Sequence, residues 1–260
     1  GIRDVAVTGV QTCALPIYAD NIVREDFFNA EIDLSQVGDN DVISWAGKNI
    51  VNGLVYGNGG IKCWPKHVVE QMKSHEAAVT ASAQVDFCWD IHYVQMNNVY
   101  SDVMNNASPL QAWRAGFREG VKMCLNKSTR PTVAEFKDRV HHRNLDHLTV
   151  WHNVGSDVDY GLWAIAGSRQ GTYMTMLTEW DHRQVQNFDA LAELWETVKD
   201  SEPRLLAGRL AEDLNTQLDL PMLVLEGEAS RFFKHHYRSN WHNQGIMVRE
   251  IDVIRQQEGW

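Results

Sequence analysis

The chain has 260 residues, of which 44% are hydrophobic, and it carries a formal net charge of −10 at pH 7. Its 10 tryptophans and its hydrophobic content are enough for a sizeable core, which excludes an intrinsically disordered chain. The acidic balance argues against a general nucleic-acid-binding protein, because neutralising phosphates requires clustered lysine and arginine.

The first residues do not read as part of a folded domain. Residues 7–17 resemble the in-frame translation of a common short-read sequencing adapter. We therefore expect residues 1–17 to be foreign sequence that packs against little, and the natural chain to start near Tyr18, in the middle of a longer protein. A motif that is missing from this chain then does not count against a family, because it can lie upstream.

Residues 18–126 mix short β-like runs, glycine-rich turns and helices, which is typical of an α/β domain. Within this part, Asp39-Asn40-Asp41 has the Asp-x-Asp form of some metal sites. It follows Gly38 and not a continuous apolar strand, so we predict mainly a turn, with metal binding as the alternative.

A glycine-rich segment occupies residues 52–65. Four glycines within eight residues cannot form the interior of a regular helix or strand, so we predict a turn with positive φ angles and exposed backbone. A ligand could lie against such a turn, and the alternative is an ordinary glycine hairpin. The phosphate-binding spacing G-x-x-x-x-G-K-[ST] is missing. The candidate ligand-binding residues are Tyr56, Gly57, Asn58, Gly59, Gly60, Lys62 and Trp64.

Apolar and polar residues alternate between positions 85 and 93, which predicts a half-buried strand. One face of that strand would carry Asp86, Cys88, Asp90 and His92 in a row. A carboxylate in this row could deprotonate an acceptor hydroxyl, and aspartate with His92 could bind Mn²⁺. The alternative is the solvated face of an edge strand.

Ser108 and Pro109 predict the start of a helix over residues 108–125. Its apolar face is expected to contain Leu110, Trp113, Phe117, Val121 and Cys124. Arg114, Arg118 and Lys122 form a basic stripe, and Glu119 could pair with any of them. Such cations suit a diphosphate leaving group, whereas exposed charge on an amphipathic helix is the alternative.

The chain is predicted to be mostly helical from Thr132 onward, with helices at residues 133–142, 145–152, 158–177, 188–199 and 203–218. The long middle helix has small residues at near-helical spacing, so we expect another helix to approach it closely. These residues are Gly161, Ala164, Ser168, Gly171 and Thr175. Polar residues 168–170 at the middle of this helix argue against a membrane span.

Residues 231–242 are basic and aromatic in an acidic chain. They could dock nucleic acid, a glycan or another anionic partner, or form a surface amphipathic segment. Cys63, Cys88 and Cys124 include no C-x-x-C pair, which predicts reduced thiols and a cytoplasmic location.

Three groups of residues carry a resemblance to a known family. They are Trp45-x-x-x-Asn49-x-x-Asn52-Gly53-Leu54-x-Tyr56-Gly57-Asn58-Gly59-Gly60-Ile61-Lys62, then Ala112-Trp113-Arg114-Ala115-Gly116-Phe117-Arg118-Glu119, and Trp151-x-x-Val154-Gly155-Ser156-Asp157. As a set, they resemble glycosyltransferase-like proteins encoded by tailed phages of marine bacteria, which are similar to the nucleotide-diphospho-sugar (GT-A) fold. The resemblance covers residues 18–177.

The resemblance implies a fold and a domain division. The fold class is α/β: residues 18–126 would be the acceptor-side half of a GT-A-like domain, and residues 127–260 a mainly helical C-terminal region. The donor side would be mostly missing, so we expect this chain by itself to turn over nothing.

The resemblance also implies an activity. If the protein is phage-encoded, this activity would take place in the host cytoplasm. It is the metal-dependent transfer of a sugar from a nucleotide-sugar donor to an unknown acceptor, with Mn²⁺ or Mg²⁺ as cofactor. Asp86 or Asp90 would be the base, His92 a metal ligand, and Arg114 and Arg118 substrate-binding residues. The segment from Gly57 to Gly60 would border the sugar, with Trp64 as an aromatic wall. The alternative is a non-catalytic phage structural or host-interaction protein that binds glycans.

Overall fold

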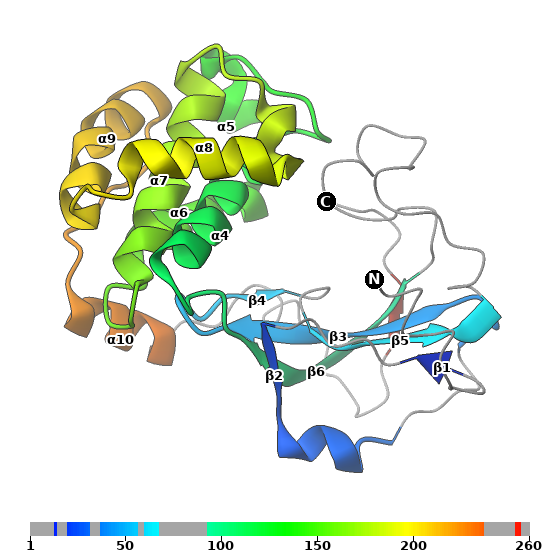
Figure 1. Cartoon of the computed structure of the whole chain (residues 1–260). Helices are drawn as coiled ribbons and strands as arrows, with labels where there is room; N and C mark the ends of the chain where they lie inside the picture. Colours follow the sequence, from blue (N-terminus) through cyan, green and yellow to red (C-terminus); the bar gives the residue numbers. More distant parts are fainter. Residues whose placement is uncertain are drawn as a thin grey trace. The chain divides into compact units, whose positions relative to one another are not determined.

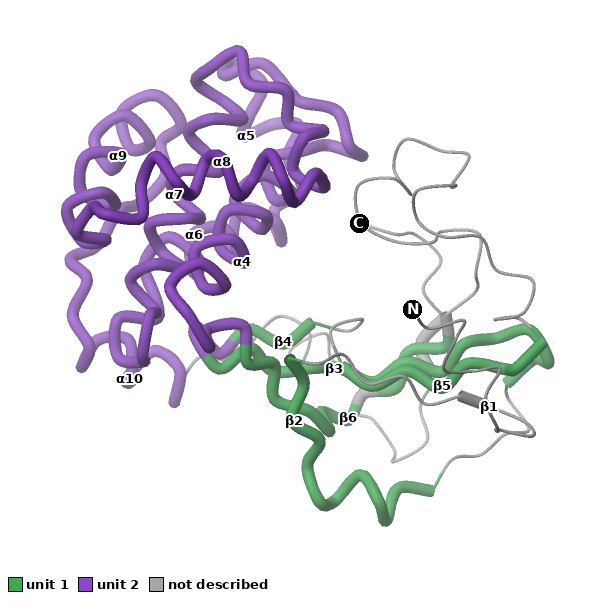
Figure 2. Tube along the Cα trace, in the orientation of Figure 1, with its two compact units in different colours: residues 1–50, 54–104, 238–260 green, residues 51–53, 105–237 purple. Residues whose placement is uncertain are grey.

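The computed structural model describes residues 13–14, 20–31, 37–56, 60–67, 93–236 and 253–255. The chain divides into two compact units (Figure 2). A sheet unit contains residues 1–50, 54–104 and 238–260, and a helical unit contains residues 51–53 and 105–237. The chain is therefore α/β and more helical in its C-terminal part, as the sequence predicts. The units divide after Met104, whereas the predicted boundary follows residue 126, because the first long helix packs within the helical unit.

The sheet unit contains a mixed sheet with the strand order β1-β5-β3-β6-β2. The strands are β1 (Cys13–Ala14), β2 (Asn21–Val23), β3 (Val42–Asn49), β4 (Val55–Tyr56), β5 (Lys62–Pro65), β6 (Tyr93–Val103) and β7 (Val253–Arg255), and a short 3₁₀ helix, η1, spans Glu25–Asn29. β4 also pairs with β3, and β7 with β6. The β3–β6 pair is parallel and the other pairs are antiparallel.

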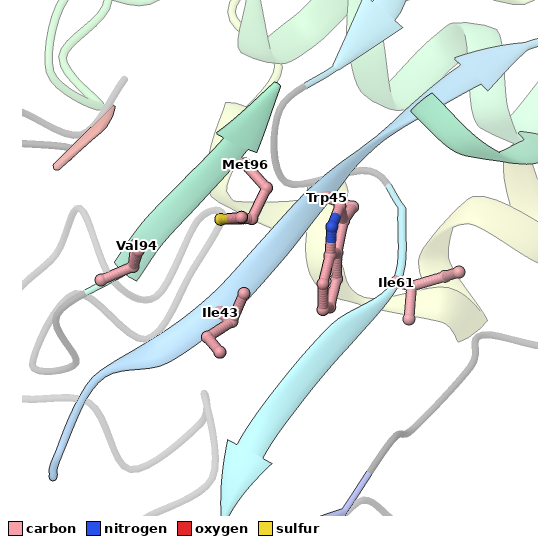
Figure 3. Packing of buried hydrophobic residues seen from close by; sticks show 5 residues of the cluster. All are labelled: Ile43, Trp45, Ile61, Val94 and Met96. Carbon is pink, nitrogen blue, oxygen red and sulfur yellow. The ribbon is translucent and has the colours of Figure 1, made fainter. Parts of the chain in front are cut away.

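The core of the sheet unit forms around β3, which is buried along nearly its whole length. Ile43 and Trp45 of β3 pack with Ile61 and with Val94 and Met96 of β6 (Figure 3). A strand with neighbours on both sides and buried on both faces is expected to be nearly continuous in apolar residues. β3 follows that pattern only over residues 42–46, where Ser44 is the polar exception, and it ends in Lys48 and Asn49.

Two sequence predictions fall largely outside the described residues. The predicted strand at 85–93 is described only at Tyr93, where β6 begins. Of residues 1–17, only Cys13 and Ala14 are described, and they pair with Pro65 and Trp64 of β5. The foreign origin of residues 1–17 stays a prediction.

The helical unit contains seven α-helices and two 3₁₀ helices among its described residues, and Figure 1 shows their arrangement. The α-helices are α4 (Pro109–Lys122), α5 (Phe136–Arg139), α6 (His142–Asn153), α7 (Gly161–Leu177), α8 (Phe188–Val198), α9 (Pro203–Leu218) and α10 (Gly227–His236), α5 being a single turn; the 3₁₀ helices are η4 (Val133–Glu135) and η5 (His182–Gln186). None of the described helices combines the length and apolar character needed to cross a membrane.

Helix α4 begins where the sequence predicts. The Ser108 hydroxyl accepts a hydrogen bond from the backbone N–H of Gln111 at 3.2 Å, and Pro109 occupies the first helical position. Trp113, Phe117 and Val121 are fully buried, which confirms the predicted apolar face.

Several predicted helices differ from the structure in their bounds: the helix predicted at 145–152 is α6, His142–Asn153, and the one predicted at 108–125 ends at Lys122. The chain from 133 to 142 is not one helix, because the buried Val140 is extended, with ψ 132°, between α5 and α6. Helix α7 begins at Gly161 and not at 158, because Tyr160, the residue before it, is left-handed with a φ of 56°. The helix predicted at 203–218 has the bounds of α9.

Helices α4 and α7 pack with their backbones in direct contact, which confirms the close approach predicted for the small-residue face of α7. A Cβ atom at Gly116 of α4 would lie 1.9 Å from the carbonyl oxygen of Ala164. In the other direction, Cβ atoms at Gly167 and Gly171 would lie 2.1 Å and 2.2 Å from the carbonyl oxygens of Trp113 and Phe117. Glycines on both helices therefore set the distance between them.

Candidate functional site

Several predicted site residues lie outside the described residues. They are the predicted bases Asp86 and Asp90, the predicted metal ligand His92, and the predicted loop residues Gly57, Asn58 and Gly59. Their roles stay predictions.

The flanks of the glycine-rich segment belong to the sheet. Tyr56 of β4 is half-buried and lies opposite Gly47 of β3. Lys62 and Trp64 of β5 are 1% and 2% exposed. A ligand can reach Lys62 and Trp64 only if neighbouring segments of this chain move. Tyr56 is therefore the most accessible of the predicted flanking residues.

Gly60 is required for a different reason than the predicted one. Positive φ angles among the described glycines occur at Gly53 and Gly155, not at Gly60. A Cβ atom at Gly60 would lie 2.5 Å from the carbonyl oxygen of Trp45 and 2.6 Å from that of Ala46. The close approach of the β3 backbone, and not backbone conformation, therefore excludes a side chain.

Replacing Gly60 with alanine is therefore expected to lower the free energy of unfolding by about 2 kcal/mol, because backbone atoms of β3 must shift. Gly38→Ala is the matched control, since the nearest atom to a Cβ there is a side-chain atom, the Asp41 carboxylate oxygen, at 3.2 Å, so a smaller loss is expected. Urea denaturation of both variants measures the difference. Equal stability of the two variants would contradict the close contact.

The Asp39-Asn40-Asp41 sequence forms a turn, as predicted. The carboxylate of Asp41 accepts a hydrogen bond from the backbone N–H of Gly38 at 2.9 Å. The described residues contain no group of three histidine, cysteine, aspartate or glutamate side chains able to hold a metal ion. The predicted ligand of Mn²⁺ or Mg²⁺, His92, lies outside the described residues, so the metal site stays a prediction.

Two of the predicted cations, Arg114 and Arg118, lie over the same aromatic ring, and we call them the basic pair. Their Cζ atoms lie 4.9 Å and 5.4 Å from the ring centroid of Phe188, at the start of α8. Burial and the neighbouring charge of Arg118 lower the pKa of Arg114. Within the described part of the chain, neither guanidinium forms an ion pair, and the Nε atom of Arg118 is buried without a hydrogen-bond partner.

Lys122, the third predicted cation, is already paired. Its Nζ atom lies 2.9 Å from a carboxylate oxygen of Glu119, the acidic residue that the sequence marks as a possible partner. The basic stripe therefore separates into one neutralised cation and the basic pair. Repulsion between the two guanidinium groups would be relieved by a bound anion, and guanidinium groups suit phosphate oxygens.

A buried arginine in α7 was not predicted to be functional. Arg169 is 2% exposed and donates hydrogen bonds to the carbonyl oxygens of His152 and Ala207, each at 3.0 Å, and to Oδ1 of Asn153 at 3.2 Å. Burial lowers its pKa to about 10. Its bonds all go to protein acceptors in α6 and α9, so Arg169 ties three helices together. A charged residue in an otherwise apolar helix was the sequence signal for this role.

The structure brings two parts of the family resemblance together within the helical unit. A Cβ atom at Gly155 would lie 2.7 Å from Cγ1 of Val51, so the turn after β3 packs against the segment 155–157. Lys234 of α10 lies over Gly53 and pairs with Asp157 at 2.6 Å. Both motifs are visible in the sequence, whereas their contact and the contribution of Lys234 are visible only in the structure.

Comparison of the chain with models of known protein families, with curated proteins and with solved structures finds no match.

Proposed function

We propose that this chain is part of a metal-dependent glycosyltransferase that moves a sugar from a nucleotide-sugar donor to an acceptor, and that the basic pair binds the diphosphate of the donor. The observation that carries the proposal is the pairing of Arg114 and Arg118 over Phe188, with no ion pair to either guanidinium within the described residues. The GT-A resemblance of the motifs, which include both arginines, supports the same assignment.

The chemistry explains why a basic pair is needed. When the bond between the sugar and the diphosphate breaks, negative charge develops on the leaving nucleoside diphosphate. Two guanidinium groups held in place by an aromatic ring can stabilise that charge without reorganising. In such an enzyme the expected Mn²⁺ or Mg²⁺ would neutralise the same diphosphate, and Asp86 or Asp90 would accept the proton of the acceptor hydroxyl.

Binding of uridine diphosphate to the chain tests the role of the basic pair. We expect weak binding, with a Kd of about 1 mM. Arg114→Gln and Arg118→Gln should each weaken it about tenfold, the effect of losing one charge-assisted hydrogen bond. The control is Arg209→Gln, which removes the same charge from an exposed position on α9. Titrations followed by NMR chemical shifts give the three affinities.

Three outcomes would contradict the proposal. One is an affinity that does not change in the Arg114→Gln, Arg118→Gln double variant. Another is an equal loss in Arg209→Gln, which would indicate non-specific attraction by net charge. Inorganic pyrophosphate that binds as well as uridine diphosphate would reduce the site to a general anion site and would also count against a nucleotide-sugar donor.

A specific observation favours the non-catalytic, glycan-binding alternative. Phe232 on α10 is 66% exposed, and the ring of His236 stacks on it with centroids 4.0 Å apart. An exposed, rigid aromatic face suits the apolar face of a sugar ring. Glycan binding that is lost in Phe232→Ala and kept in Arg114→Gln would favour this function over sugar transfer.

A further inference from the structure

Polar contacts join helix α10 to the rest of the helical unit at Ser230 and Lys234. Ser230 is the buried residue of this helix. Its hydroxyl accepts a hydrogen bond from the backbone N–H of Gly155 at 3.1 Å and lies 3.0 Å from the hydroxyl of Ser156. Phe232 points its ring largely into solvent. Phe233 is half-buried, so α10 buries part of one aromatic side chain but contributes no fully buried apolar residue.

The second docking residue is Lys234, one helical turn after Ser230. Its Nζ atom lies 2.6 Å from Oδ2 of Asp157, and the two side chains are only 16% and 5% exposed. Its stem covers Gly53, with Cγ 3.2 Å from where a Cβ atom of that glycine would lie. Because Gly53 has a φ of 79°, a side chain is disfavoured there and the backbone stays open to this contact.

One atom of this contact is left unsatisfied in the docked state. Oδ1 of Asp157 is buried and has no hydrogen-bond partner among the described residues. A buried carboxylate oxygen without a partner is unfavourable, and it would be hydrated if α10 left. Undocking therefore loses one ion pair and the Ser230 hydrogen bonds, but it gains solvation of Asp157.

We propose that α10 is a detachable strap, which undocks as a unit while the rest of the helical unit stays folded. The Lys234–Asp157 ion pair stabilises the docked state of this strap. Helices α4 and α7 are joined by backbone contact and by buried aromatic residues, so their opening requires far more free energy than that of α10. Opening uncovers Gly53, Ser156 and Asp157, which belong to two motifs far apart in the sequence. The strap does not depend on the proposed glycosyl transfer.

Amide hydrogen exchange of the full chain, read by mass spectrometry, tests the strap. In the unmodified protein, amides of α10 should exchange faster than those of α4 and α7. Lys234→Met removes the charge and keeps the stem, and it should accelerate exchange in α10 by about 10- to 100-fold, because it leaves Asp157 without its cation. Exchange in α4 and α7 should change less than about twofold.

A matched variant separates this ion pair from ordinary surface pairs. Lys199 of the exposed Lys199–Glu196 pair has a side chain 40% exposed, so Lys199→Met should leave exchange in α10 unchanged. Asp157→Asn should accelerate amide exchange in α10 as much as Lys234→Met does. The double variant should exchange little faster than either single variant.

Three results would overturn the strap. The first is exchange of α10 in the unmodified protein as slow as that of α4 and α7, which would mean that α10 opens only when the whole unit unfolds. The second is equal acceleration of α4, α7 and α10 in Lys234→Met. The third is unchanged exchange of α10 in both Lys234→Met and Asp157→Asn.

Discussion

Replacing Gly167 with alanine is expected to lower the free energy of unfolding by about 3 kcal/mol or more. The new Cβ atom would lie 2.1 Å from the carbonyl oxygen of Trp113, and the next nearest atoms also belong to the backbone of α4. A backbone atom cannot rotate away as a side chain can, so α4 and α7 must separate. Separation would also loosen the contact between Gly116 and Ala164.

Gly208→Ala provides the control for this change. Gly208 lies within α9 with no atom within 4 Å of a Cβ position, so alanine there should stabilise the protein by up to about 1 kcal/mol through helix propensity. The two glycine-to-alanine changes should thus shift the urea midpoint in opposite directions. A Gly167→Ala variant within about 1 kcal/mol of the unmodified protein would show that the two helices are not in backbone contact.

Helix ends and the small-residue face could be predicted because they depend on nearby residues. Ser108 and Pro109 start α4, and Pro203 starts α9, since capping and proline geometry act within one helical turn. The break at Val140 was missed because extended backbone there follows from burial against other elements. The identity of α4 as the partner of α7 also depends on tertiary packing.

In the candidate site, too, features that depend on tertiary packing could not be predicted from the sequence. The basic pair could be found from the spacing of Arg114 and Arg118, but the ring beneath it comes from Phe188, which is distant in sequence. At Gly60, composition indicates a special backbone position, yet the cause is the neighbouring strand and not the local φ angle. The contact of Lys234 with Asp157 has no local sequence signal, because nothing in either segment specifies the other.

Two buried histidines should make the protein less stable in mild acid. His152 is fully buried, with Nε2 3.0 Å from the hydroxyl of Thr172, and burial followed by the charge of Arg169 lowers its pKa to about 3. Burial, followed by the charge of Arg143, lowers the pKa of His147 to about 4. Both values lie well below the ordinary value of 6.5.

The sign of the effect follows from proton binding. Below pH 6.5 the unfolded chain protonates both histidines, whereas the folded chain keeps His147 neutral down to about pH 4 and His152 down to about pH 3. The unfolded state binds more protons in that window, so the free energy of unfolding falls as pH falls. Between pH 7 and pH 5 the two groups together should remove roughly 4 kcal/mol of stability.

Urea denaturation at several pH values between 7 and 5 measures this loss, and His152→Asn assigns it. Asparagine does not titrate, so the slope of stability against pH should be about half that of the unmodified protein, whatever the stability of the variant at pH 7. Because burial in α6 is the main cause of both pKa shifts, the loss must appear as unfolding of the helical unit. An unchanged slope in His152→Asn would show that the imidazole is solvated or has a carboxylate partner, and that the packing of α6 against α7 is looser than the structure has it.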